Sequence, residues 1–166
     1  MTTKTPSKSF QETLFSDTEQ SVYAVLDAAS FSNLPAELYH HKAEYVCLYR
    51  GELAPDIATV APYLVSLPPE ANITHWVLKQ IGRNNPGIFI HARVSVYELR
   101  KHLRTFLMIK DANDQQVYFR YYDPRVLRGY IPSCNTEEKK TLFGPVSHYF
   151  AENREGNQLI RYGLND

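Results

Sequence analysis

The residues with the clearest chemical potential lie in the segment 117–132, VYFRYYDPRVLRGYIP. Arg120, Arg125 and Arg128 surround Asp123 there, and a guanidinium group can bind a carboxylate through two parallel hydrogen bonds. We predict that these arginines form a basic face for an acidic segment or a terminal carboxylate of another protein. In the alternative interpretation, Asp123 caps a helix and one arginine pairs with a carboxylate inside the fold. The sequence leaves both interpretations open.

Tyrosine is frequent in this chain, with twelve copies. Tyr is enriched at the hot spots of protein interfaces, so Tyr122 and Tyr130 join the candidate protein-binding residues. A tyrosine-rich edge of the core explains the same excess more simply. Arg100 and Arg104 complete the candidate set, although together with Lys101 they also fit an ordinary solvated helix face.

Catalytic motifs are missing from the sequence. It has no GxSxG elbow, no HExxH pair and no glycine-rich phosphate loop. His40 and His41 are adjacent, so on a helix they point in different directions and do not readily share a metal. Cys47 lies in an apolar run and fits a small core residue better than a nucleophile. We therefore expect no enzymatic activity, no metal and no cofactor.

Local patterns around Asp123 predict a strand, a corner and a helix. Apolar and polar positions alternate over 117–122, which is the period of a strand. Asp123 fits an N-cap, and Pro124 fits the first helical position. Apolar residues at helical spacing follow as far as Pro132, which we expect to end the helix.

The rest of the chain alternates between strand and helix patterns. Ser95 with Glu98 three residues later indicates a capping box, and the helix after it should bury Val96, Leu99 and Leu103. The apolar run 106–110 should form a hairpin with 117–122 around a polar turn. We predict an α/β fold: one domain, 21–166, with a mixed sheet flanked by helices, after a flexible lead-in over 1–20. Further strands are expected at 21–30, 43–51, 62–68, 88–92, 147–152 and 159–163, and further helices at 34–42, 54–61, 72–81 and 135–144.

The net charge of the chain does not favour a particular class of binding partner, because eighteen basic residues balance eighteen acidic ones. Residues 93–128 are nevertheless basic, with eight Lys and Arg against four Asp and Glu, so a nucleic-acid-binding module using this region is the alternative function. The zero net charge and interleaved acids argue against it, and we expect no nucleic-acid partner. The sequence shows no signal-peptide core and no apolar run long enough to cross a membrane. This predicts a cytoplasmic protein without membrane contact. In a reducing cytosol the thiols of Cys47 and Cys134 are expected to be free.

Several segments together resemble one known family. They are VYAVLDAA, AEYVCLYRGE, VAPYLVSLP, GIFIHA, LRKHLRTFLMI, YFRYYDPRVLRGYIP and FGPV. In this order and spacing they are similar to the type VI secretion effector-adaptor (Tap/TEC-type chaperone) family, long classed as a domain of unknown function. The resemblance implies a cytoplasmic adaptor that binds a toxic effector and loads it onto the VgrG spike, without catalysis.

Overall fold

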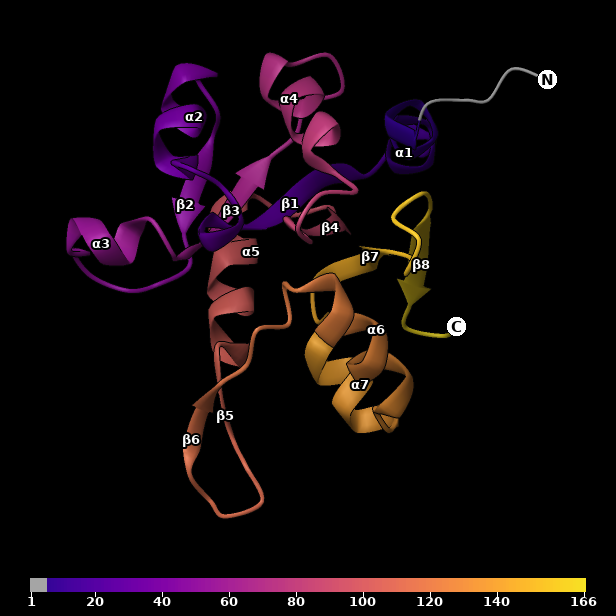
Figure 1. Cartoon of the computed structure of the whole chain (residues 1–166). Helices are drawn as coiled ribbons and strands as arrows, with labels where there is room; N and C mark the ends of the chain where they lie inside the picture. The colour runs from indigo at the N-terminus through magenta and orange to yellow at the C-terminus, as the bar shows by residue number, and fades with distance from the viewer. Residues whose placement is uncertain (1–5) are drawn as a thin grey trace.

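The computed structural model describes residues 6–166, and side chains from residue 9 onward. A six-stranded sheet runs through the molecule in the order β2-β3-β1-β4-β7-β8, and each of its neighbouring pairs is antiparallel (Figure 1). Helices pack on both of its faces, so the predicted single α/β domain with a helix-flanked sheet is confirmed. The sheet was expected to be mixed, but its strand pairs are all antiparallel. The six strands are β1 (Ser21–Asp27), β2 (Tyr45–Cys47), β3 (Pro62–Ser66), β4 (Gly87–Ala92), β7 (Val146–Glu152) and β8 (Leu159–Gly163).

The central strands are covered on both faces. β1 pairs with β3 on one side and with β4 on the other, so that Tyr23 lies opposite both Ser66 and Ile90. All six residues of β4 are buried, as are the last six of β1. A strand buried on both faces appears in a sequence as a continuous apolar run, which is why these two strands were predictable.

Two separate apolar layers enclose the sheet. One side is packed by α5 (Val96–Leu103), α6 (Pro124–Ser133) and α7 (Thr136–Phe143). The other side is packed by α1 (Pro6–Phe15), α2 (Leu34–His40) and α4 (Asn72–Gln80). Residues that alternate along β1 divide between the two layers, since Tyr23 and Val25 face the first and Ala24 and Leu26 face the second.

The helix α1 differs from the expected lead-in over residues 1–20. Within the described part of that segment, Phe10 and Leu14 are fully buried against the second layer. The Nε2 atom of His91 in β4 lies 2.7 Å from the carbonyl oxygen of Leu14. Phe10 and Leu14 are four residues apart and therefore lie on the same helix face. Most of the other residues in this segment are polar, so its composition indicated a flexible lead-in and not a helix with one buried face.

The predicted hairpin is present, but its second strand is shorter than expected. β5 (Met108–Lys110) and β6 (Gln116–Tyr118) form a two-stranded sheet of their own, which projects from the body in Figure 1. The prediction of a strand over 117–122 was wrong beyond Tyr118. Tyr121 and Tyr122 are both buried in a turn, because Asp123 N–H bonds back to the Arg120 carbonyl and bends the chain into α6.

Other boundaries shift by a few residues. The helix expected at 54–61 is the short α3 (Pro55–Ala58), and the strand expected at 43–51 contracts to β2. Pro132 lies inside α6, which ends one residue later with Cys134 as its C-cap. Among residues 6–166, no helix is both long and apolar enough to cross a membrane.

Candidate functional site

An apolar groove opens between the projecting hairpin and the segment after β2. Its volume is about 520 Å³. The segment 48–60 forms one wall, and the end of α5 with the hairpin forms the other. We call it the hairpin groove, and its lining residues are Leu48, Tyr49, Arg50, Leu53, Ile57, Val60, Arg104, Leu107, Met108 and Tyr118.

Large apolar side chains on the groove walls are open to solvent. Tyr118 is 67% exposed, Val60 47%, Ile57 41% and Met108 39%. Single exposed apolar residues are common on protein surfaces, but a contiguous group of them around a depression marks an interaction site. The Tyr118 ring also lies 6.0 Å from the Tyr49 ring, so aromatic surface links the two walls of the groove.

The hairpin itself exposes apolar residues on both of its faces. Met108 lies opposite Tyr118 on the groove face, and Ile109 lies opposite Val117 on the other face. Ile109 and Val117 are 38% and 37% exposed. An isolated two-stranded hairpin is only marginally stable in water, and its residues 108–110 and 116–118 are all exposed. A binding partner that covers one of these faces would supply the missing burial.

Arg104 forms a rigid part of the groove. Its guanidinium donates three hydrogen bonds of 3.0 Å, to the carbonyl oxygens of Cys47, Leu48 and Tyr49. β2 is an edge strand of the main sheet, and Cys47 is its last residue. A side chain that occupies the carbonyls at the end of this edge blocks pairing with another strand there. The sequence suggested a solvated or partner-binding Arg104, whereas the structure uses this side chain to cover the sheet edge.

The corner after the hairpin contains the first predicted arginine. Arg120 Nη2 bonds to Oδ2 of Asp27, a carboxylate that is only 5% exposed at the end of β1. The Arg120 guanidinium also lies 5.9 Å from the centre of the Tyr122 ring. Burial raises the pKa of Tyr122, and the neighbouring Tyr49 and the charge of Asp27 raise it further. The corner is therefore a polar cluster around the buried Asp27 carboxylate, and it connects the hairpin to the central strand.

Asp123 has the predicted capping role. Its Oδ1 accepts the backbone N–H of Arg125 at 2.9 Å, and Pro124 occupies the first turn of α6. The Arg125 side chain binds the same carboxylate, with Nε at 3.1 Å from Oδ1 and Nη2 at 2.7 Å from Oδ2. Of the two interpretations of this corner, intramolecular pairing is the one present here.

The remaining candidates also have neighbours within the chain. Arg128 donates to the backbone carbonyl of Glu152 in β7. The Tyr130 ring packs edge-on against Phe119 at 4.6 Å. Arg100 lies over the exposed ring of Tyr97, with 5.5 Å between them.

Most of the arginines that were expected to form a basic face thus have partners inside the fold. Arg104, Arg120, Arg125 and Arg128 all have hydrogen-bond partners in the chain. Their role in binding other proteins stays a prediction. The hairpin groove was missed, because its two walls lie about 50 residues apart in the sequence. One local signal was present in the sequence. The hairpin strands 108–110 and 116–118 carry apolar residues on both faces, although a hairpin with one solvent-facing side needs them on one face only.

Histidine and cysteine residues are scattered over different elements. Within the described residues, no three His, Cys, Asp or Glu side chains group as metal ligands would. Cys47 lies in β2 and Cys134 caps α6, and both are free thiols. Burial raises the pKa of the Cys47 thiol and that of the Cys134 thiol.

Comparison with known proteins identifies the family. The model of the Domain of unknown function family DUF4123 matches residues 22–141. The chain belongs to the DUF4123 family. No curated protein and no solved structure shows a significant match to it.

The DUF4123 match runs from Val22 in β1 to Thr141 in α7. It therefore includes every residue of the hairpin groove and both partners of the Asp27–Arg120 contact. α1, β7 and β8 lie outside the match, although β7 pairs with β4 and completes the main sheet. The groove and the corner are consequently parts of the DUF4123 domain itself.

Proposed function

We propose that this DUF4123 protein is a cytoplasmic adaptor of a type VI secretion system. It binds a toxic effector, delivers it to the VgrG spike and catalyses no reaction. The sequence resemblance described above supplies the names of the two partners. The hairpin groove is the observation that carries the proposal, because an exposed apolar groove of this size is what a protein-binding module needs.

The groove favours one kind of occupant. Its walls offer Ile57, Val60, Met108 and Tyr118 to apolar side chains. Arg50 lies at the groove and has no hydrogen-bond or ion-pair partner among the described residues. An apolar effector segment with an adjacent acidic residue matches both features, since a free guanidinium gains a charge-assisted hydrogen bond from a carboxylate. Burial of aromatic and aliphatic anchors supplies most of the affinity.

A co-purification experiment tests the proposal. The tagged protein is co-expressed with the candidate toxin and spike proteins encoded beside its own gene, and the captured proteins are identified. We expect the wild-type protein to capture both. The double variant Ile57→Ser, Tyr118→Ser should lose the toxin while its melting temperature stays unchanged, because both side chains are exposed.

Tyr39→Ser is the matched control. Tyr39 is 81% exposed and lies on α2, outside the groove, so its removal should leave capture intact. If the groove variant captures the toxin as well as the control does, the groove is not the effector site. Failure of the wild-type protein to capture either partner would overturn the adaptor function itself.

A further inference from the structure

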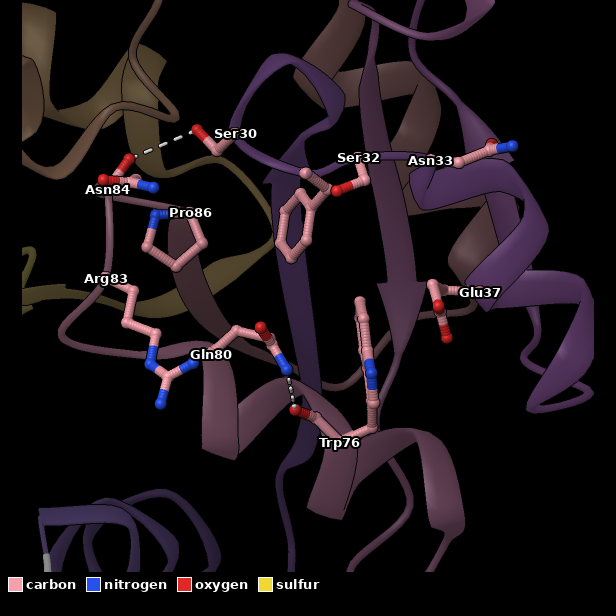
Figure 2. Close-up of a pocket in the computed structure, with 10 residues that line it drawn as sticks. Ser30, Ser32, Asn33, Glu37, Trp76, Gln80, Arg83, Asn84 and Pro86 are labelled. Atoms are coloured by element: carbon pink, nitrogen blue, oxygen red, sulfur yellow. Dashed lines mark hydrogen bonds between the residues drawn. The ribbon is translucent and has the colours of Figure 1, made fainter.

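A second cavity shares no lining residue with the hairpin groove. We call it the Trp76 pocket; its volume is about 340 Å³. It lies between the turn after β1, the helix α4 and the loop 82–86, on the side of the sheet that α2 and α4 cover (Figures 1 and 2). Its lining includes Phe31, Glu37, Trp76, Gln80, Arg83 and Pro86.

Aromatic rings form one wall of the Trp76 pocket. Phe31 and Trp76 stack with their ring centres 5.5 Å apart, and His41 packs on Trp76 at the same distance. Both Phe31 and Trp76 are partly exposed. Pro86 adds an apolar surface on the other side, as Figure 2 shows. The pocket therefore offers a flat apolar surface that can pack against one side chain of a ligand.

Hydrogen-bond donors form the opposite end. Figure 2 shows Arg83 and Gln80 on one side of Trp76 and Glu37 on the other. Arg83 has no hydrogen-bond or ion-pair partner among the described residues, whereas Glu37 already has His41 at 3.6 Å. The Gln80 amide already donates to the Trp76 carbonyl oxygen at 3.4 Å, so the guanidinium is the donor left for a ligand. A guanidinium beside an apolar wall suits a carboxylate ligand.

The loop that carries Arg83 is held at two points. The Gly82 N–H donates to Oε2 of Glu152 at 3.1 Å, and Ser30 Oγ donates to the Asn84 carbonyl at 3.2 Å. Asn84 and Asn85 have positive φ angles of 54° and 51°, a conformation that Asn tolerates better than most residues. Arg83 is thus presented from a fixed turn, which reduces the entropy lost when a ligand binds.

We propose that the Trp76 pocket binds a carboxylate of a partner peptide. Arg83 binds the carboxylate, and an adjacent apolar side chain of the peptide packs on Phe31 and Trp76. The carboxylate comes either from the end of the partner chain or from an Asp or Glu side chain. This inference deepens the proposed function, on which it rests for the presence of a second protein partner, and it gives the adaptor two sites that can be occupied at once.

Intrinsic fluorescence can report on this pocket alone, because Trp76 is the single tryptophan of the chain. Three short peptides without Trp or Tyr serve as probes. Acetyl-Ala-Leu-Ala has a free terminal carboxylate, acetyl-Ala-Leu-Glu-Ala-amide has only a side-chain carboxylate, and acetyl-Ala-Leu-Gln-Ala-amide has neither. We expect a saturable change in Trp76 emission with at least one of the two carboxylate peptides, at concentrations up to about 1 mM, and none with the neutral peptide. The peptide that binds identifies the source of the carboxylate.

Three variants sharpen the test. Arg83→Gln should weaken binding about tenfold or more, because a charge-assisted hydrogen bond is lost. Glu37→Gln should strengthen it, since a nearby negative charge disappears. Arg161→Gln is the matched control: it removes an exposed arginine of β8 that lines neither the Trp76 pocket nor the hairpin groove, and it should leave the titration unchanged.

The outcomes separate this inference from the proposed function. Equal binding of neutral and carboxylate peptides, unchanged binding by Arg83→Gln, or no saturable change in emission would overturn the carboxylate site. None of these results depends on the groove. Conversely, peptide binding at Trp76 combined with failure to capture a toxin or a spike protein would leave the pocket standing and remove the adaptor function.

Discussion

Asp27 and Arg120, 93 residues apart in the chain, form an ion pair that joins the end of β1 to the corner before α6. Each carboxylate oxygen of Asp27 has a different partner. Oδ2 binds the Arg120 guanidinium, and Oδ1 accepts the N–H of Ala29 at 3.0 Å to cap the short helix η1 (Ala28–Ser30). One side chain therefore positions both the hairpin corner and the turn that leads into the Trp76 pocket.

The variant Arg120→Ala should reduce the free energy of unfolding by about 1–3 kcal/mol, because the buried Asp27 carboxylate loses its charged partner. Half of the Arg120 side chain is exposed, and screening by solvent places the effect toward the lower end of that range. Urea denaturation measures the change. Arg154→Ala, at an exposed position in the β7–β8 turn, is the control, and an equal loss in both variants would contradict a specific role for the pair.

Asp123 should stabilise α6 as its N-cap. Asp123→Ala is expected to cost about 0.5–2 kcal/mol of unfolding free energy, and Asp123→Asn less, because the amide oxygen can still cap the helix. Arg125→Ala should have little effect, since its side chain is exposed and the cap remains. Chemical denaturation of the three variants at pH 7 tests the order. A larger loss from Arg125→Ala than from Asp123→Ala would contradict it.

The pKa of Asp123 predicts that the stability of the protein depends on pH in acid solution. Partial burial alone would raise the pKa of Asp123, but the hydrogen bonds from Arg125 outweigh it and lower the pKa below the ordinary 3.8. The ionised carboxylate therefore stabilises the fold fully above pH 3.8, and this contribution is lost as the pH falls through the lowered value. Acid titration of the stability difference between the wild-type protein and Asp123→Asn measures it. A difference that does not shrink in acid would be inconsistent with this assignment.

Arg104 should protect the edge of the main sheet. Arg104→Ala frees three carbonyl groups of the β2 segment, and we expect about 1–3 kcal/mol lower stability together with concentration-dependent self-association. Arg104→Lys should restore only part of the stability, because an ammonium group lacks the planar fork that reaches three acceptors. Denaturation and light scattering measure the two effects. Arg100→Ala, one helical turn earlier, is the control and should behave as the wild-type protein does.

Stability should fall in mildly acidic solution. Burial lowers the pKa of His91, His102 and His148 below the ordinary 6.5, so these groups take up protons more readily in the unfolded chain. Their contribution is complete above pH 6.5 and decreases as the pH falls toward the lowered values. Around His91, the Arg161 and His148 charges oppose its protonation and Asp17 favours it.

The variant His91→Phe tests whether His91 contributes to this dependence of stability on pH. It should reduce the dependence of stability on pH between about 7 and 5, and it should loosen α1, because the contact with the Leu14 carbonyl is lost. Amide hydrogen exchange over residues 9–15 reports on the helix. An unchanged pH dependence together with unchanged exchange would show that His91 does not anchor α1.

Local patterns allowed several features to be predicted from the sequence. Asp123 caps α6, and Ser95 with Glu98 forms the expected capping box of α5. The buried strands β1 and β4 also appear where continuous apolar runs indicated them. Each of these features depends on residues within a few positions of each other, and hydrogen bonds or burial at that range leave a direct trace in the sequence.

Only the tertiary structure decided the partners of the arginines and the position of the sites. Arg120 reaches Asp27 and Arg104 reaches the β2 carbonyls because the sheet order brings these segments together across 93 and about 56 residues. The hairpin groove and the Trp76 pocket likewise combine side chains from distant segments. A charged side chain in a sequence does not specify which carboxylate or carbonyl it will meet, since that choice follows from strand order and layer packing.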